Sequence, residues 1–332
     1  MRNVTLKMAV LGALSFVSTQ VYAAGFVSLP ASPTGSAYIN CYNANRVVPP
    51  STADDVKGNF GSYPIASPLQ PSTTVNHTCF VAKPTFESVA PISGYTLIAT
   101  RSGDIPPATG LTGSIGTIVD RVWRNAANDT CIFGTRVTMT NVDHDPVTSG
   151  TQHFEVNDIA RGGFGTGAVN VAYTFFSTTG NTSPVYRAGR TFTSVQHRAL
   201  AYNTLANKEQ NGIGYLDLPT IGGSSTLNIN GVNSTIDATT TASVSSAQQD
   251  AQVNSNWVDF TADTVFADDD GSTNALSGYT YIQAACNATN PDAVGASWVK
   301  AGAIRLRQTA QEFAIFKEIE IDGYAPPGAT VP

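Results

Sequence analysis

Alternation of hydrophobic and polar residues with a period of two recurs along the chain and predicts β-strands. The clearest case is Glu312–Ile321, with four large apolar side chains on one face and two glutamates on the other. This pattern is typical of a half-buried strand. Further strands are predicted at Ser93–Thr100, Ile115–Trp123, Cys131–Thr140, Val169–Phe176, Thr191–Val195, Trp257–Ala262, Tyr279–Ala285 and Trp298–Arg307, which are rich in β-branched and aromatic residues.

Turn signals such as Gly-Gly and Asp-Pro separate these runs. Only Arg198–Gln210 and Ser243–Val253 carry weak helical patterns. Strands in close succession, without long intervening helices, indicate antiparallel neighbours. We therefore predict an all-β fold, an antiparallel β-sandwich with long loops and at most one or two short helices.

Residues 1–23 have the features of a cleaved export signal. Arg2 and Lys7 form a basic start, Met8–Val17 is an apolar run, and Ala23 is a small residue before the expected cut. The run is too short to span a membrane, and no second apolar run of spanning length follows. The sequence therefore predicts a bacterial protein that works in the periplasm, at the cell surface or extracellularly, without a transmembrane segment in the mature chain.

The remaining residues, 24–332, are expected to form one large sandwich domain. Its N-terminal part, 24–110, is rich in proline, which favours edges and turns over inner strands. Residues 219–255 form a low-complexity insert of Gly, Ser, Thr and Asn, typical of a long loop. A domain boundary at this insert is less favoured, because Cys286 would then lack a partner across it.

Four cysteines are present, Cys41, Cys79, Cys131 and Cys286. An even count in an exported chain predicts two disulfides, for which three pairings exist. We favour Cys41–Cys79 and Cys131–Cys286, because neighbours in sequence usually meet first. The spacings do not resemble a zinc site or a redox-active motif.

The chain has 18 basic and 24 acidic residues, and its charged residues make up only 13%. Removing residues 1–23 would leave 16 basic and 24 acidic residues, a net charge of −8. An acidic excess disfavours nucleic-acid binding, which needs clustered Lys and Arg against phosphates.

The densest cluster of metal-capable groups is Asp143, His144 and Asp145, followed by His153. Two imidazoles with nearby carboxylates suit a transition metal, copper first. The alternative is an ordinary turn, in which Asp143 caps backbone amides before the Asp-Pro pair. Both interpretations stay open at the level of sequence.

Asp268, Asp269 and Asp270, followed by glycine, resemble a calcium-binding loop. The full helix–loop–helix spacing fails, because Phe266 stands where an oxygen ligand is needed. A solvated acidic loop between strands is the alternative.

Arginines are concentrated in the middle of the chain, which indicates either an anion-binding face or cross-strand ion pairs with Asp120, Glu155 and Asp158. The cationic set is Arg121, Arg124, Arg136, Arg187, Arg190, His197 and Arg198. Glu155 and Asp158 are also a weak candidate for a glycosidase acid pair. A serine nucleophile motif of the G-x-S-x-G type is absent.

Aromatic residues are candidates for stacking on sugar rings, although a sandwich core also needs them. They are Trp123, Tyr173, Phe175, Phe176, Trp257 and Trp298. The sequence favours an exported protein with a binding or structural role, whose partners are a surface polysaccharide or other copies of itself. The alternatives are a metal-binding protein using His144 and His153, with copper or calcium as the cofactor, and a secreted polysaccharide-active hydrolase.

Overall fold

Strands alone make up the regular structure in the part of the chain that the computed structural model describes. The described residues are 25–31, 38–41, 79–107, 113–146, 149–165, 167–174, 182–183, 185, 187–190, 255–267, 274–286, 297–308 and 317–331. The strands are β1 (Val27–Leu29), β2 (Tyr38–Asn40), β3 (Thr96–Ile105), β4 (Gly116–Asn125), β5 (Thr130–Met139), β6 (Val156–Gly162), β7 (Val169–Thr174), β8 (Thr182–Ser183), β9 (Arg187–Gly189), β10 (Trp257–Thr264), β11 (Leu276–Ser277), β12 (Tyr279–Ala285), β13 (Val299–Gln308) and β14 (Lys317–Tyr324).

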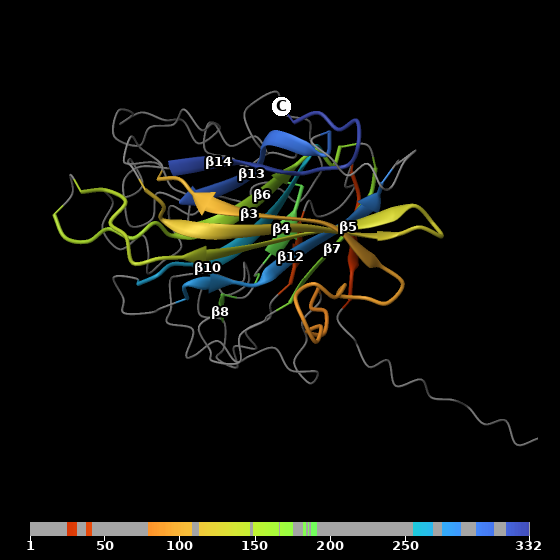
Figure 1. The fold of residues 1–332 in the computed structure, drawn as a ribbon, viewed down its shortest axis with the longest axis horizontal. Helices are drawn as coiled ribbons and strands as arrows, with labels where there is room; N and C mark the ends of the chain where they lie inside the picture. The colour runs from red at the N-terminus through yellow and green to blue at the C-terminus, as the bar shows by residue number, and fades with distance from the viewer. Residues whose placement is uncertain are drawn as a thin grey trace, which may run out of the picture.

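The strands form two sheets that pack face to face (Figure 1). Sheet A has the order β1-β7-β12-β5-β4-β3, and β11 and β8 continue it beside β5. Sheet B has the order β14-β13-β6-β10-β9-β2. Neighbouring strands are antiparallel except β8 and β11. The predicted antiparallel sandwich is therefore confirmed.

The main core lies between the sheets. Val122 of β4 and Phe133 of β5 belong to one buried cluster with Ile159 of β6 and Leu306 of β13. Because successive side chains of a strand point to opposite faces, each strand contributes every second residue to this cluster. Full burial of one such side chain stabilises the fold by roughly 1.5–3 kcal/mol.

A second, smaller core lies on the outer face of sheet A. Trp123 and Ile132 are neighbours in sequence of core residues, point the other way, and are also fully buried. Part of their cover is residues 79–95, which we call the strap; its Val81 and Ile92 belong to this second cluster. Burial on both faces explains why β4 and β5 carry adjacent apolar residues, Val122-Trp123 and Ile132-Phe133.

A buried ion pair joins the two sheets. Arg161 of β6 donates from Nη1 to Oδ1 of Asp120 in β4 over 3.2 Å, and both side chains are buried. Asp120 Oδ2 also accepts the backbone N–H of Tyr324 at 2.7 Å, and Arg161 donates to the Tyr324 carbonyl at 2.6 Å. Burial raises the pKa of Asp120 and lowers that of Arg161, while their mutual attraction opposes both shifts.

Both predicted disulfides are confirmed. Cys41–Cys79 connects the end of β2 in sheet B to the start of the strap. Cys131–Cys286 connects β5 to the end of β12 and closes a separation of 155 residues. These bonds are typical of proteins in oxidising, exported compartments.

The structure extends several predicted strands and adds others that the sequence did not reveal: the long strand β6 and the short strands β1, β2, β8, β9 and β11. The strand β6, Val156–Gly162, contains Asn, Asp, Arg and Gly, so its composition hides a fully buried strand. Its polar side chains are tolerated because they have charged partners: Asp158 pairs with Arg307 of the adjacent β13, and Arg161 pairs with Asp120 of the facing sheet. The expected signal 1–23, the helices 198–210 and 243–253, the strand 191–195 and the insert 219–255 lie outside the described residues.

Candidate functional site

The residues of the predicted transition-metal site form a turn. Asp143 Oδ1 accepts the backbone N–H of Asp145 at 3.0 Å and that of Gln152 at 3.2 Å. This is the capping role that the sequence left open as the alternative, in which the side chain satisfies amides that the bend exposes.

The two imidazoles of this region lie in different surroundings. His144 is fully buried, and its ring packs edge-on against Phe154 with centroids 5.4 Å apart. His153 shares a hydrogen bond of 2.8 Å with Asn141 Oδ1 and stacks near Phe266. Within the described part of the chain, no group of three or more His, Cys, Asp or Glu is placed to hold a metal ion. The structure therefore gives no support to a copper site here.

The predicted calcium loop lies outside the described residues, because these omit positions 268–273. Calcium binding by Asp268, Asp269 and Asp270 stays a prediction.

The two carboxylates of the weak glycosidase candidate bind different partners. Glu155 accepts a hydrogen bond from Asn157, whereas Asp158, the next residue in β6, contacts Arg307.

The arginines of the predicted cationic set whose side chains are described form ion pairs or bind backbone carbonyls. Their ion-pair partners differ from those expected. Arg121 and Arg136 both bind Glu87 of the strap, and Arg124 binds Asp129 across its own hairpin at 2.9 Å. The expected partners Asp120 and Asp158 bind Arg161 and Arg307 instead. Arg190 donates to three backbone carbonyls, and burial lowers its pKa to about 10.

The strap is held to the outer face of sheet A by polar contacts at its middle. Both carboxylate oxygens of Glu87 are engaged by guanidinium groups, and the next carbonyl, that of Ser88, accepts the indole N–H of Trp123 at 2.9 Å. The two guanidinium groups also lie over the ring of Tyr279, at 5.4 and 5.7 Å from its centroid. The strap therefore closes part of this face to a partner.

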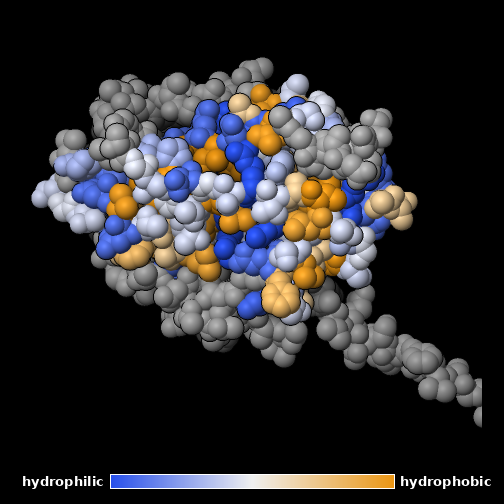
Figure 2. Space-filling model, in the orientation of Figure 1, coloured by the Kyte–Doolittle hydropathy of each residue, from blue (hydrophilic) through white to orange (hydrophobic). Residues whose placement is uncertain are grey.

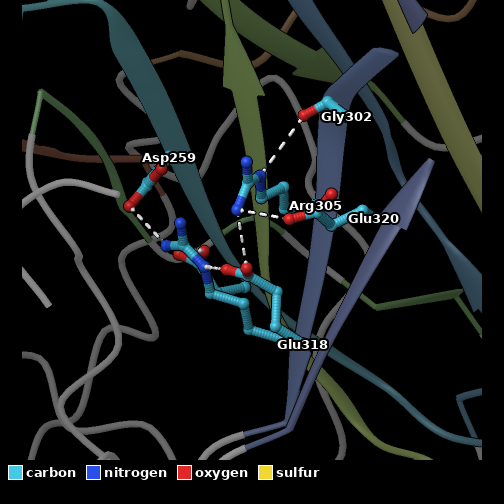
Figure 3. A network of polar contacts seen from close by, with 7 residues as sticks. Asp259, Gly302, Arg305, Glu318 and Glu320 are labelled. Carbon is cyan, nitrogen blue, oxygen red and sulfur yellow. Dashed lines mark hydrogen bonds and ion pairs between the residues drawn. The ribbon is translucent and has the colours of Figure 1, made fainter. Parts of the chain in front are cut away.

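The outer face of sheet B carries a charged ladder, defined by Asp158, Asp259, Arg305, Arg307, Glu318 and Glu320 (Figure 3). Arg307 binds carboxylates from three strands: Asp158 of β6 at 3.0 Å, Asp259 of β10 at 3.2 Å and Glu318 of β14 at 2.9 Å. Arg305 bridges Glu318 and Glu320, each at 2.8 Å.

Burial is the main cause of the pKa shift of Asp158 in this ladder. It raises the pKa of Asp158 well above 3.8, and the negative charge of Asp259 adds to the rise, while Arg307 opposes it. Asp158, Asp259 and Arg307 are buried. The ladder connects four strands of sheet B, and of its members only Glu320 is well exposed to a ligand.

In the described part of the chain, the edges of the two sheets also offer backbone groups that can form hydrogen bonds with a partner. Among the described residues, β3 pairs only with β4, along ten residues. Ser102, Gly103 and Asp104 are all exposed, and a Cβ added at Gly103 would meet no atom within 4 Å. Because successive residues face opposite sides, this stretch of β3 is open to solvent on both faces.

The other edges are shorter or more charged. The strands β1 and β2 have three residues each. The edge strand β14 has eight residues, of which Lys317, Glu318, Glu320 and Asp322 are charged. Short length and charge are the usual means by which sheet edges are protected from pairing. The edge of β3 is therefore the least protected long edge in the described part of the chain.

On the face of the molecule drawn in Figure 2, the described residues form a mosaic of hydrophilic and hydrophobic positions rather than one apolar area. The predicted aromatic candidates Trp123, Tyr173, Trp257 and Trp298 are all buried, and Phe175 and Phe176 lie outside the described residues. The exposed aromatic residue is Phe86 of the strap, with 68% of its surface accessible.

The sequence analysis did not predict the exposed end of β3, because the predicted strand ended at Thr100, where polar residues begin. A usable signal is present: 96–105 contains no proline and only two charged residues, and Pro106 follows directly. Comparisons of the chain with protein-family models, curated proteins and solved structures found no match. No helix of the described residues has the length and apolar character needed to cross a membrane.

Proposed function

We propose that the protein is an exported binding or structural protein that accepts an extended polypeptide segment at the open edge of β3. The observation that carries this proposal is the ten-residue strand with one described partner and both faces exposed at Ser102–Asp104. An open edge offers a row of backbone N–H and C=O groups, and strand addition uses them for affinity.

The rest of the described structure favours binding of a partner at a sheet edge over binding at the outer face of a sheet. The strap covers part of the outer face of sheet A, and the charged ladder on the outer face of sheet B is largely buried. The two disulfides suit the periplasm, the cell surface or the extracellular space. A polysaccharide partner has less support, because the described aromatic residues proposed for sugar stacking are buried.

The test is site-specific photo-crosslinking in cells that express the full chain. A photoreactive phenylalanine derivative replaces Ser102 on β3 in one variant and Thr117 on β4 in the control. Thr117 is also exposed, and it pairs with Asp104 on one side and with Thr138 of β5 on the other.

We expect the Ser102 variant to form an adduct with a polypeptide in the envelope or medium fraction, and the Thr117 variant to form none there. Equal adducts at both positions, no adduct at Ser102, or a chain that stays in the cytoplasm would overturn the proposal.

A further inference from the structure

We propose that the segment that adds to β3 is β3 of a second copy of this chain, in an antiparallel two-fold pairing centred on Ser102. This inference rests on the proposed function, because it names the partner of the same edge. A two-fold interface uses the same surface on both copies, so a strand that pairs with itself closes the assembly as a dimer.

The alternation of side chains between the two faces of β3 restricts the register in which two copies of this strand can pair. In a continuous sheet, residues that lie opposite each other must point to the same face, and the side chains of a strand alternate between faces. With Ser102 opposite Ser102 of the second copy, Arg101 lies opposite Gly103, and Thr100 lies opposite Asp104. Arg101 and Gly103 share one face in the chain itself, and Thr100 and Asp104 share the other.

The charges of β3 are compatible with this register. Arg101 and Asp104 are its only charged residues, and neither lies opposite a like charge of the second copy. Arg101 instead lies opposite Gly103 of the second copy, where an added Cβ would meet nothing within 4 Å in the chain itself. Nη1 of Arg101 is buried, and its charge acts on Asp120 of β4. Like charges directly opposite each other destabilise strand pairs, so their absence favours this pairing.

The same pairing is unfavourable for the other long edge. Glu318, Glu320 and Asp322 of β14 alternate onto one face. A two-fold antiparallel pairing centred on Glu320 would place Glu320 opposite itself and Glu318 opposite Asp322 of the second copy. The charge pattern therefore selects β3 rather than β14 as the edge that joins two copies.

Two features of the chain set the length of the new pairing. Pro106 lacks the N–H needed to continue the ladder beyond Ile105. At the other end, the register of β3 shifts between Leu97 and Ala99. The pairing therefore extends over Ala99–Ile105 of each copy.

The first experiment places a cysteine on the proposed axis. All four native cysteines are in disulfides, so Ser102→Cys adds the single thiol of the chain. We expect the purified full exported chain with this substitution to form a disulfide-linked dimer under mild oxidation, seen on a non-reducing gel. The matched control, Thr117→Cys on the inner strand β4, is expected to form no disulfide-linked dimer on the same gel, because Thr117 lies away from the proposed axis.

The second experiment tests the register through charge. In the proposed pairing, Gly103→Lys places lysine opposite Arg101 twice per dimer, and Gly103→Glu places glutamate there. We expect the first to weaken and the second to strengthen dimerisation, each by about tenfold in the dissociation constant measured by sedimentation equilibrium.

The outcomes separate this inference from the proposed function. A dimer whose dissociation constant is the same in both Gly103 variants would overturn the inference, as would absence of the Ser102→Cys dimer. In either case, a photo-adduct at Ser102 with a different polypeptide would leave the proposed function standing. Absence of any photo-adduct at Ser102 would overturn both.

Discussion

Arg307 and Asp158 lie directly opposite each other on the adjacent strands β13 and β6, with Nη1 and Oδ1 3.0 Å apart. Both side chains are buried on the outer face of sheet B, the face away from the main core. The same guanidinium group binds Asp259 and Glu318, so one cation offsets carboxylates from three strands. The arrangement makes the stability of sheet B depend on Arg307.

Replacing Arg307 with methionine is expected to lower the free energy of unfolding by about 3–5 kcal/mol, because Asp158 and Asp259 lose a buried counter-charge. Urea denaturation measures the change. The control is Arg124→Met, whose partner Asp129 has a side chain 44% exposed, so we expect about 1 kcal/mol or less. Equal losses in the two variants would contradict the assigned role.

The raised pKa of Asp158 predicts a pH dependence of stability. Because burial favours the protonated carboxyl, the contribution of this group is fully present below its ordinary pKa of 3.8 and is lost as the pH rises through the raised value. Asp158→Asn removes this ionisation. We therefore expect the free energy of unfolding of the variant to rise relative to that of the native chain as the pH rises. Urea midpoints between about pH 4 and pH 8 test this, and parallel curves would contradict it.

The two disulfides are expected to contribute unequally. In the chain-entropy account, Cys131–Cys286 stabilises by about 5 kcal/mol and Cys41–Cys79 by about 4 kcal/mol, because the first closes the longer loop. The separations are 155 and 38 residues. Paired alanine substitutions, one disulfide at a time, and urea unfolding give both values. The reverse order would mean that the entropy of the unfolded chain does not decide the difference.

Gly134 of β5 is required by close packing. A Cβ at this position would lie 2.6 Å from Cζ3 of Trp123 and 3.0 Å from the ring of Tyr281. Gly134→Ala is therefore expected to destabilise the fold by about 1–3 kcal/mol. Gly103→Ala is the matched control on the open edge, where we expect no loss. Thermal unfolding compares the two, and an undisturbed Gly134→Ala variant would show that the Trp123 ring moves aside.

Local pattern was enough to predict most of the strands. In Lys317–Tyr324, Ile319 is buried in the core while Glu320 is exposed, as the alternation indicated. The polar strand β6 escaped prediction because the partners of Asp158 and Arg161 come from distant parts of the chain. No local pattern carries that information.

The candidate site residues also divide into those whose contacts are local in sequence and those whose partners lie far away in the chain. Asp143 caps a turn, which sequence chemistry allowed, since its acceptor lies next to the amides it binds. The partner of Arg121 and Arg136 is Glu87, on a strap that sequence analysis did not associate with sheet A. Ion-pair partners depend on which strands meet and in which register, and one residue of shift moves a side chain to the other face.

The sequence by itself determined the strand-rich character of this protein, because alternation along a strand is a property of the chain. The order of the cysteines favoured the pairing that the structure then showed. Only the tertiary structure decided that residues 79–95 cover part of sheet A, that Arg307 connects four strands, and that β3 has β4 as its one strand partner among the described residues. Those features arise when segments far apart in sequence compete for the same faces and edges of a sheet. The outcome depends on burial and cross-strand hydrogen bonding, which no single segment contains.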